Sequence, residues 1–314
     1  MRLLLIFLIT YSFAAHAAAV DSNTVKKSSA KRYWNNGIHK HKWFLVNTTA
    51  TALAGYSIYR FYQEWYSQYE TAPFHTVNDL KHWKQMDKLG HITSANSSAE
   101  KIYYALRWSG VPQKRAAITS TISTWSLMAS IDIMDGFSSQ WGFSPSDIVA
   151  NTTGSLLFML QTIKWGEQKM IIKWSYHDTP EVKDYNKLNR LGSGLTNNWL
   201  HNYNGQTYWL TLNSNCFAKP RKTWQKILGV SVGLGAQGMI HETNNSTYSN
   251  YYPEANEIER YRQWYISPDL DLTHIRVRSK FLKGIFYLTR FFKSPLPTIE
   301  FNKIDGARFH LFYW

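Results

Sequence analysis

Three side chains that could do chemistry lie close together near residue 90: Asp87, Lys88 and His91. Residues four apart share one face of an α-helix, so a helix here would place the carboxylate of Asp87 beside the imidazole of His91. An imidazole can accept a proton near neutral pH, and a neighbouring carboxylate can orient it. The ammonium group of Lys88 could hold a phosphate. The segment therefore predicts either an acid–base site or a polar contact between helices.

Two later segments place further polar groups in apolar, helix-like sequence. Asp132 and Asp135 are three residues apart, and Asp147 and Asn151 are four apart. Burying such groups is costly unless they are paired or used. We therefore treat the three segments as one candidate site. Its candidate catalytic residues are His91, Asp87, Asp132, Asp135 and Asp147, and its candidate binding residues are Lys88, Asn151, Ser144 and Trp141.

This cluster has two interpretations. In the first, His91 is a general base, the aspartates supply a second acid or bind a cation, and the protein is a hydrolase or transferase acting on a lipid or cell-wall precursor. In the second, the cluster is a polar core that joins helices by hydrogen bonds, and the role is structural or binding. The sequence contains no Gly-x-Ser-x-Gly, His-Glu-x-x-His or paired cysteines. One histidine among carboxylates is a poor zinc site, so we predict no metal, and the cofactor is unknown.

The fold is predicted to be mixed α+β, with an N-terminal bundle of about four helices. Apolar and small residues indicate helices over 43–69, 86–109, 113–134 and 144–165. Ser144 is typical of a helix N-cap, and Pro145 of a first helical position. Gly136, Gly142 and Gly154 are expected to serve turns and close packing.

A change of period from 3.6 to 2 predicts an antiparallel sheet in the C-terminal part. Candidate strands cover 208–213, 227–235 and 261–266, and a terminal hairpin joins 298–304 to 307–314 through a two-residue Asp305-Gly306 turn. Residues 280–293 read as a short, basic, amphipathic helix suited to a membrane surface. The expected domains are a bundle over 43–174 and a β-rich region over 175–314.

The N-terminus and the charge predict an envelope protein. Residues 1–19 have the basic start, short apolar run and small residues of a signal peptide, and 20–42 form a basic arm. The formal net charge is +14. An exported basic chain meets anionic lipid or lipopolysaccharide, and an outer-membrane protein complex is a further possible partner. No nucleic-acid motif is present, so we predict no nucleic-acid partner and a location in the periplasm or outer membrane of a Gram-negative bacterium.

The spaced motifs resemble a known family. Asp87, Lys88 and His91, the Asp132 and Asp135 pair, and the segment 143–154 are similar to the YfiM-type predicted periplasmic lipoproteins. A longer form of that family, common in Bacteroidetes, is similar along most of the chain, including 208–210 and 267–272. The core is more distantly similar to VanZ-like membrane proteins. This resemblance implies an envelope location and a helical core more than it implies a reaction. The chain differs from the pattern in having Asp132 where Glu is usual, and in lacking a lipidation cysteine.

Overall fold

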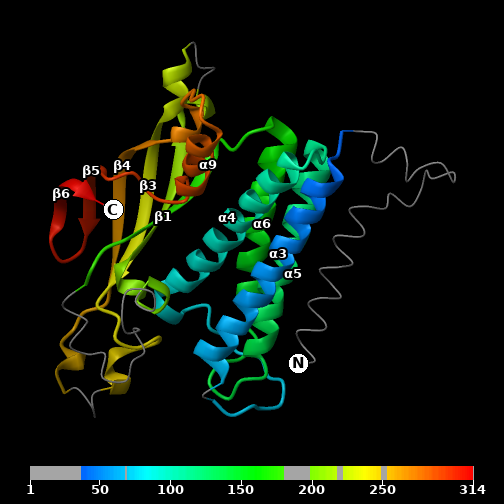
Figure 1. The fold of residues 1–314 in the computed structure, drawn as a ribbon. Coiled ribbons are helices and arrows are strands. Elements are labelled where there is room, and N and C mark those ends of the chain that lie inside the picture. Colours follow the sequence, from blue (N-terminus) through cyan, green and yellow to red (C-terminus); the bar gives the residue numbers. More distant parts are fainter. Residues whose placement is uncertain (1–36, 68, 180–198, 218–221, 249–252, 314) are drawn as a thin grey trace. The chain divides into compact units, whose positions relative to one another are not determined.

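The computed structural model describes residues 37–67, 69–179, 199–217, 222–248 and 253–313 (Figure 1). The predicted signal peptide and most of the predicted basic arm lie outside the described residues. The chain divides into two compact units. The helical unit contains the residues up to Asp79 together with 94–168, and the sheet unit contains 80–93 together with 169–314.

The helical unit is built from four long helices among the described residues. They are α3 (Lys40–Phe61), the part of α4 (Met86–Trp108) that follows Thr93, α5 (Gln113–Asp135) and α6 (Pro145–Trp165). A π-helical turn, Tyr62–Tyr66, extends α3. None of the described helices is both long enough and apolar enough to cross a membrane.

Local sequence sets the ends of α5 and α6 as predicted. The hydroxyl of Ser144 accepts a hydrogen bond from the backbone N–H of Asp147 at 3.2 Å, and Pro145 begins α6. This arrangement satisfies one of the amides that a helix N-terminus leaves without a partner. Helix α5 ends before Gly136, and a Cβ on Gly136 would lie 2.4 Å from the ring of Phe74. A larger residue at position 136 would therefore displace that ring.

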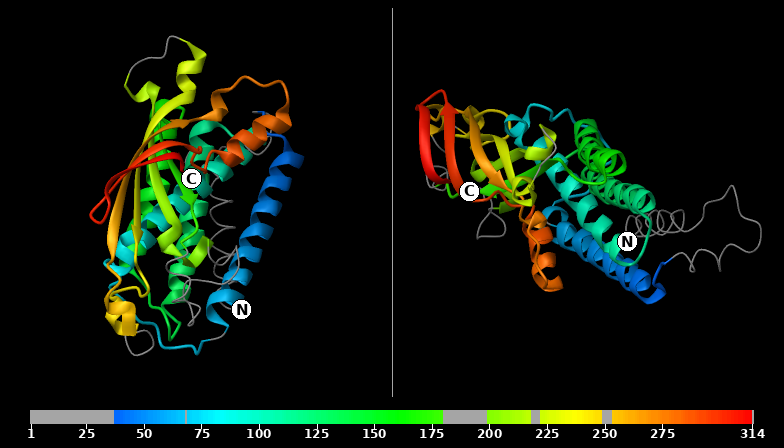
Figure 2. Two further views of the ribbon diagram at one scale, coloured as in Figure 1. Left: turned by 90° about the vertical axis from the view of Figure 1, so that its left-hand side faces the viewer. Right: turned by 90° about the horizontal axis from the view of Figure 1, so that it is seen from above.

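The sheet unit contains six described strands in the order of the chain, each antiparallel to the next. They are β1 (Met170–Tyr176), β2 (Gln206–Asn213), β3 (Leu228–Gln237), β4 (Tyr261–Leu270), β5 (Leu296–Asn302) and β6 (Gly306–Tyr313). Helix α9 (Lys280–Thr289) lies between β4 and β5 in the chain (Figure 2). The predicted fold class, a helical N-terminal part followed by an antiparallel sheet, is confirmed.

The segment after α9 pairs with the outer edge of β1. The N–H of Trp174 donates to the carbonyl of Phe291 at 2.8 Å, and the N–H of Lys293 donates to the carbonyl of Trp174 at 3.0 Å. An unpaired strand edge is a site of unwanted association, and this segment covers part of it.

One face of the sheet holds an aromatic core. The rings of Trp209, Tyr265 and Tyr313 come from three strands, with centroids 4.6 to 5.9 Å apart. Gly233 of β3 lies opposite Trp209, and a Cβ there would be 2.7 Å from the indole ring. Glycine at this position therefore lets the indole lie across β3. We call this buried side of the sheet the inner face and the other side the outer face.

Several predicted boundaries were wrong. Helix α3 begins at Lys40, inside the predicted arm 20–42, and β1 begins at Met170, inside the predicted bundle 43–174. Helix α9 ends at Thr289 rather than residue 293, because the next residues pair with β1. The predicted turn is also longer, because Asn302 pairs with Gly306 and leaves three residues between them. The side chain of Asn302 accepts from the N–H groups of Ile304 and Asp305 at 2.8 and 2.7 Å, and Gly306 has a φ of 73°.

Candidate functional site

The first predicted cluster lies at the start of α4, in the sheet unit. Lys88 donates to Oδ2 of Asp87 at 2.7 Å, and the hydroxyl of Tyr203 donates to Oδ1 at 2.8 Å. Nε2 of His91 lies 3.7 Å from the same Oδ1, so the predicted pairing one helical turn apart is present. The carboxylate of Asp87 thus contacts a cation, a phenol and an imidazole.

These contacts keep Asp87 ionised. Burial alone would raise the pKa of this carboxyl group. The attraction of His91 and Lys88, with hydrogen bonds from Lys88 and Tyr203, outweighs burial and lowers the pKa below its usual value. An ionised carboxylate can both orient an imidazole and anchor a helix. The chemistry of Asp87 alone is therefore compatible both with an acid–base site and with a polar core that joins helices.

The helical unit holds a second, more deeply buried pair. Nδ2 of Asn151 on α6 donates to Oδ2 of Asp132 on α5 at 2.7 Å. The side chains are fully buried, and the bond joins two neighbouring helices. Inside a protein, where the dielectric constant is low, a hydrogen bond is electrostatically stronger than in water. This pair is therefore suited to fixing the register of α5 against α6.

Asp135 and Ser144 have partners that the motif spacing did not identify. The hydroxyl of Tyr66 donates to Oδ1 of Asp135 at 2.6 Å, and burial with the nearby Asp135 charge raises the pKa of that phenol. The hydroxyl of Ser144 donates to Oδ1 of Asp79 at 2.6 Å, and Ser146 donates to the same oxygen at 2.8 Å. Tyr66 and Asp79 are 69 and 65 residues away from their partners in the sequence, so only the fold could reveal these contacts.

The remaining predicted residues contribute mainly through the backbone and through packing. The carbonyl of Trp141 lies 2.7 Å from Nε2 of His75, and its ring packs edge-on against Tyr69. The carbonyl of Gly154 accepts from Asn96 at 3.1 Å. A Cβ on Gly142 would lie 3.0 Å from Val77. These contacts agree with packing roles for both glycines.

The predicted residues belong to both units. Asp87, Lys88 and His91 come together in the sheet unit. The helical unit contains Asp132, Asp135, Asp147, Asn151, Ser144 and Trp141, of which Asp132 and Asn151 contact each other directly, and Ser144 and Asp147 contact each other at the helix cap.

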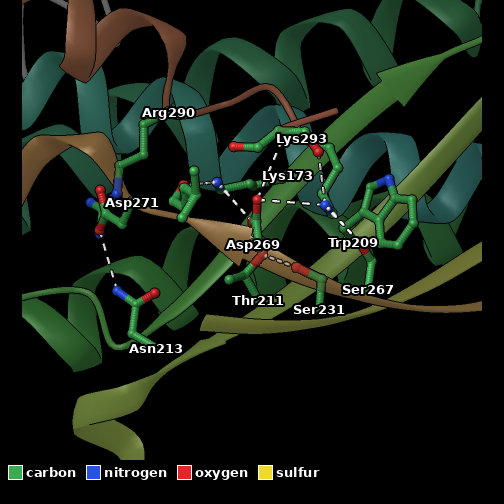
Figure 3. A network of polar contacts seen from close by, with 12 residues as sticks. Lys173, Trp209, Thr211, Asn213, Ser231, Ser267, Asp269, Asp271, Arg290 and Lys293 are labelled. Carbon is green, nitrogen blue, oxygen red and sulfur yellow. Dashed lines mark hydrogen bonds and ion pairs between the residues drawn. The ribbon is translucent and has the colours of Figure 1, made fainter. Parts of the chain in front are cut away.

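A larger charge network, which motif reasoning missed, lies on the inner face of the sheet (Figure 3). Asp269 of β4 is its centre. Lys173 of β1 lies 2.8 Å from Oδ2 of Asp269, and Lys293 lies 3.6 Å from Oδ1. Thr211 of β2 also donates to Oδ2 at 2.6 Å. All four side chains are buried, and they come from four separate segments of the chain.

A second carboxylate extends the network. Nη2 of Arg290 lies 2.9 Å from Oδ2 of Asp271, and Asn213 donates to the same oxygen at 3.2 Å. Oδ1 of Asp271 caps the following turn by accepting from Thr273. The feature of the sequence that could have indicated this network is the segment 267–272, which places two aspartates in a strand-like, apolar stretch. This segment contributes to the family resemblance, and the motif spacing predicts no role for its aspartates.

The network holds its carboxylates ionised and lowers the affinity of one lysine for its proton. Burial alone would raise the pKa of Asp269, but Lys173 and Lys293 together with hydrogen bonds from Lys173 and Thr211 lower it. Burial lowers the pKa of Lys293 to about 8; Asp269 opposes this shift and Lys173 adds to it. Lys293 also donates to the hydroxyl of Ser267 and the carbonyl of Pro268, at 3.1 and 2.9 Å.

The Asp132–Asn151 bond predicts a stability effect. Asn151→Ala should lower the free energy of unfolding by about 1–3 kcal/mol, because it removes a buried donor to a carboxylate. Chemical denaturation followed by tryptophan fluorescence would measure this loss. Thr153→Ala, at an exposed position on the same helix, is the matched control and should change little. An unchanged midpoint for Asn151→Ala would contradict a structural role for this pair.

Lys293 predicts a pH dependence. Its pKa is about 8 in the folded protein and lies near the ordinary value of 10.5 in the unfolded chain. Between these values the unfolded chain binds more protons, so the contribution of Lys293 makes the free energy of unfolding rise with pH. Lys293→Met should flatten this rise between pH 8 and 10.5, whereas Lys283→Met on exposed α9 should not. Denaturation curves at several pH values would test this, and equal slopes for wild type and Lys293→Met would count against it.

Comparison with known families identifies the segment that carries the predicted motifs. Residues 78–162, from just before α4 to the last turn of α6, match the family described as "Predicted periplasmic lipoprotein (DUF2279)". Neither the curated proteins nor the solved structures gave a match. The family resemblance is thus confirmed over this segment, while the more distant VanZ-like resemblance stays a prediction. The same description confirms the predicted location in the periplasm or outer membrane.

Proposed function

We propose that this cell-envelope protein is associated with a membrane and that its acid, histidine and asparagine cluster has a structural or binding role. One observation carries the proposal. Helices α5 and α6 of the helical unit bury many polar side chains and expose several large apolar ones. This is the reverse of the pattern in a helix that packs in water, where the apolar stripe faces the core.

Helix α5 displays this reversal along its length. Its buried side chains include many hydroxyl groups and one carboxylate, whereas four large apolar side chains are exposed. The buried polar residues are Thr119, Ser120, Thr121, Ser123, Thr124 and Asp132, and the exposed apolar residues are Ile118, Ile122, Trp125 and Ile133. Small side chains allow helices to approach closely, which is typical of helices that pack within lipid.

Helix α6 repeats the pattern. Its buried side chains include those of Asp147, Asn151, Ser155, Gln161 and Thr162, and its exposed ones include Val149, Leu156, Leu160 and Ile163. Each exposed aliphatic side chain would gain about 1.5–3 kcal/mol on full transfer from water to an apolar medium. A lipid surface supplies such a medium, and the anionic lipid or lipopolysaccharide of the envelope suits the net charge of +14.

The polar cluster fits a structural role in such a protein. Asn151 joins α6 to Asp132 of α5, and Tyr66 joins the end of α3 to Asp135. In an apolar surrounding, polar side chains are stable only when they are hydrogen-bonded, and satisfied groups select one arrangement of the helices. The cluster would thus add specific contacts to the apolar core that the helices share around Tyr103 and Phe158.

Vesicle flotation tests the membrane proposal. The full-length protein should float with vesicles of phosphatidylcholine and phosphatidylglycerol. The double variant Val149→Gln and Leu160→Gln should bind at least about tenfold more weakly, because two apolar contacts are lost. Glu257→Gln, exposed in the sheet unit and outside α6, is the control and should bind as the wild type does. A wild-type protein that stays at the bottom of the gradient would overturn the proposal and favour a protein complex as partner.

A second candidate is the hydrolase or transferase acting on a lipid or cell-wall precursor. The observation in its favour is the 3.7 Å approach of His91 to an ionised Asp87, which can orient a general base. If His91 is catalytic, His91→Ala should reach normal levels in the envelope, keep its melting temperature and reproduce the phenotype of a gene deletion. If the variant is stable and fully functional in the native host, the enzymatic candidate fails.

A further inference from the structure

The outer face of the sheet carries a continuous row of exposed apolar side chains. The row crosses five neighbouring strands, and each member is the cross-strand partner of the next: Leu210, Val232, Ile266, Ile299 and Phe309. These side chains are between 41% and 67% exposed. With strands about 4.8 Å apart, the row is about 19 Å wide.

Further apolar residues widen the row into a patch. Trp264 and Phe301 are cross-strand partners on β4 and β5, and both are exposed. Leu228 and Val230 extend the patch along β3 toward the start of that strand, and they are exposed as well. Single exposed apolar residues are ordinary on protein surfaces, but a contiguous patch marks a binding surface.

The inner face has the opposite character. Thr211, Ser231 and Ser267 lie side by side across three strands and are fully buried, and Glu300 is buried on β5. The charge network around Asp269 lies on the same face (Figure 3). The inner face therefore combines buried polar side chains with the aromatic core, whereas the row on the outer face is apolar and exposed. In water the outer face of an antiparallel sheet is normally polar.

Charge differs between the two ends of the strands. At the end where β2 and β4 finish and β3 begins, the connecting segments carry exposed Lys222, Arg276, Arg278 and Lys283. Within the described part of these segments, 214–217, 222–227 and 271–290, the one acidic residue is Asp271, which is buried against Arg290. At the other end of the strands, exposed Glu259 and Asp305 pair with exposed Lys303 and Arg308, and Glu257 is also exposed, so acidic and basic residues occur together there.

Exposed aromatic side chains accompany the basic end. Phe217, Trp224 and Phe281 are among the most exposed large apolar residues of the sheet unit. Aromatic rings next to cations are typical of the boundary between lipid hydrocarbon and head groups, where the cations attract anionic lipid. We call the basic and aromatic segments 214–217, 222–227 and 271–290 the basic end.

We propose that the outer face of the sheet lies against the hydrocarbon of an anionic lipid membrane, with the basic end at the phosphate head groups. This inference rests on the proposed membrane association and adds a surface and an orientation to it. The apolar row gives no charge with which to recognise a polar partner, and the basic end matches an anionic lipid surface. Both features belong to the sheet unit alone and are independent of the helical pattern.

A fluorescent probe on the outer face tests the contact. Cys216 is the only cysteine, and it is exposed, so Cys216→Ser provides a background for single labels. Val232→Cys labelled with an environment-sensitive nitrobenzoxadiazole group should shift to shorter wavelength on vesicles that contain phosphatidylglycerol. Lipids with a nitroxide in the acyl chain should quench this probe. The matched control, Glu257→Cys with the same label, should neither shift nor be quenched.

Charge reversal tests the orientation. Arg276→Glu together with Arg278→Glu should weaken binding to phosphatidylglycerol vesicles by tenfold or more, and high salt should weaken wild-type binding in the same way. Glu257→Gln is the control and should leave binding unchanged. Circular dichroism and melting curves of each variant would establish that it is folded before binding is compared.

The outcomes separate this inference from the proposed function. Flotation of the full-length protein with an unshifted, unquenched label at position 232 would overturn the sheet contact and leave membrane association standing. A shift that occurs without vesicles, and rises with protein concentration, would assign the outer face to a second copy of the chain and would also overturn the inference. Absence of flotation would overturn both.

Discussion

The sheet unit depends on the carboxylate of Asp269. Its two oxygens bind Lys173 from β1, Lys293 from the segment after α9, and Thr211 from β2. These segments are far apart in the sequence, and no apolar contact could hold them at such specific positions. A buried ion pair contributes little net stability compared with apolar residues of the same shape, but loss of one partner is severe because a charge is left buried. The network therefore acts mainly to select one arrangement of the strands and of the segment that covers β1.

The position of Lys293 links this network to the edge of the sheet. Its backbone pairs with Trp174 of β1, and its side chain reaches across the inner face to Asp269 while lying 5.1 Å above the ring of Trp209. One residue thus fixes the chain between α9 and β5. Because the segment is held there, β5 can return to pair with β4, and the terminal hairpin follows.

The sequence predicted features that depend on neighbouring residues and missed those that depend on the fold. The Ser144 cap, the start of α6 and the end of α5 follow from residue type within one helical turn, and the structure confirms all three. The pairing of Asp87 with His91 also follows from helical spacing. Tyr66, Asp79 and Tyr203 were missed because their partners lie 65 or more residues away. The Asp269 network was missed because alternation was read from apolar residues, whereas the buried face of this sheet is polar.

Both units bury many polar side chains and expose large apolar ones, and this pattern bears on what surrounds the molecule. This pattern follows a period of 3.6 residues in the helices and a period of 2 residues in the sheet. The two occurrences therefore arise from different sequence patterns. Two unrelated protein partners would each need a matching apolar surface. A lipid surface requires only that polar groups be turned inward, as they are around Asp132 and Asp269. Under the proposed membrane association, a single apolar medium would be the simpler physical cause for both units, and it would account for the ionisable groups that each unit buries.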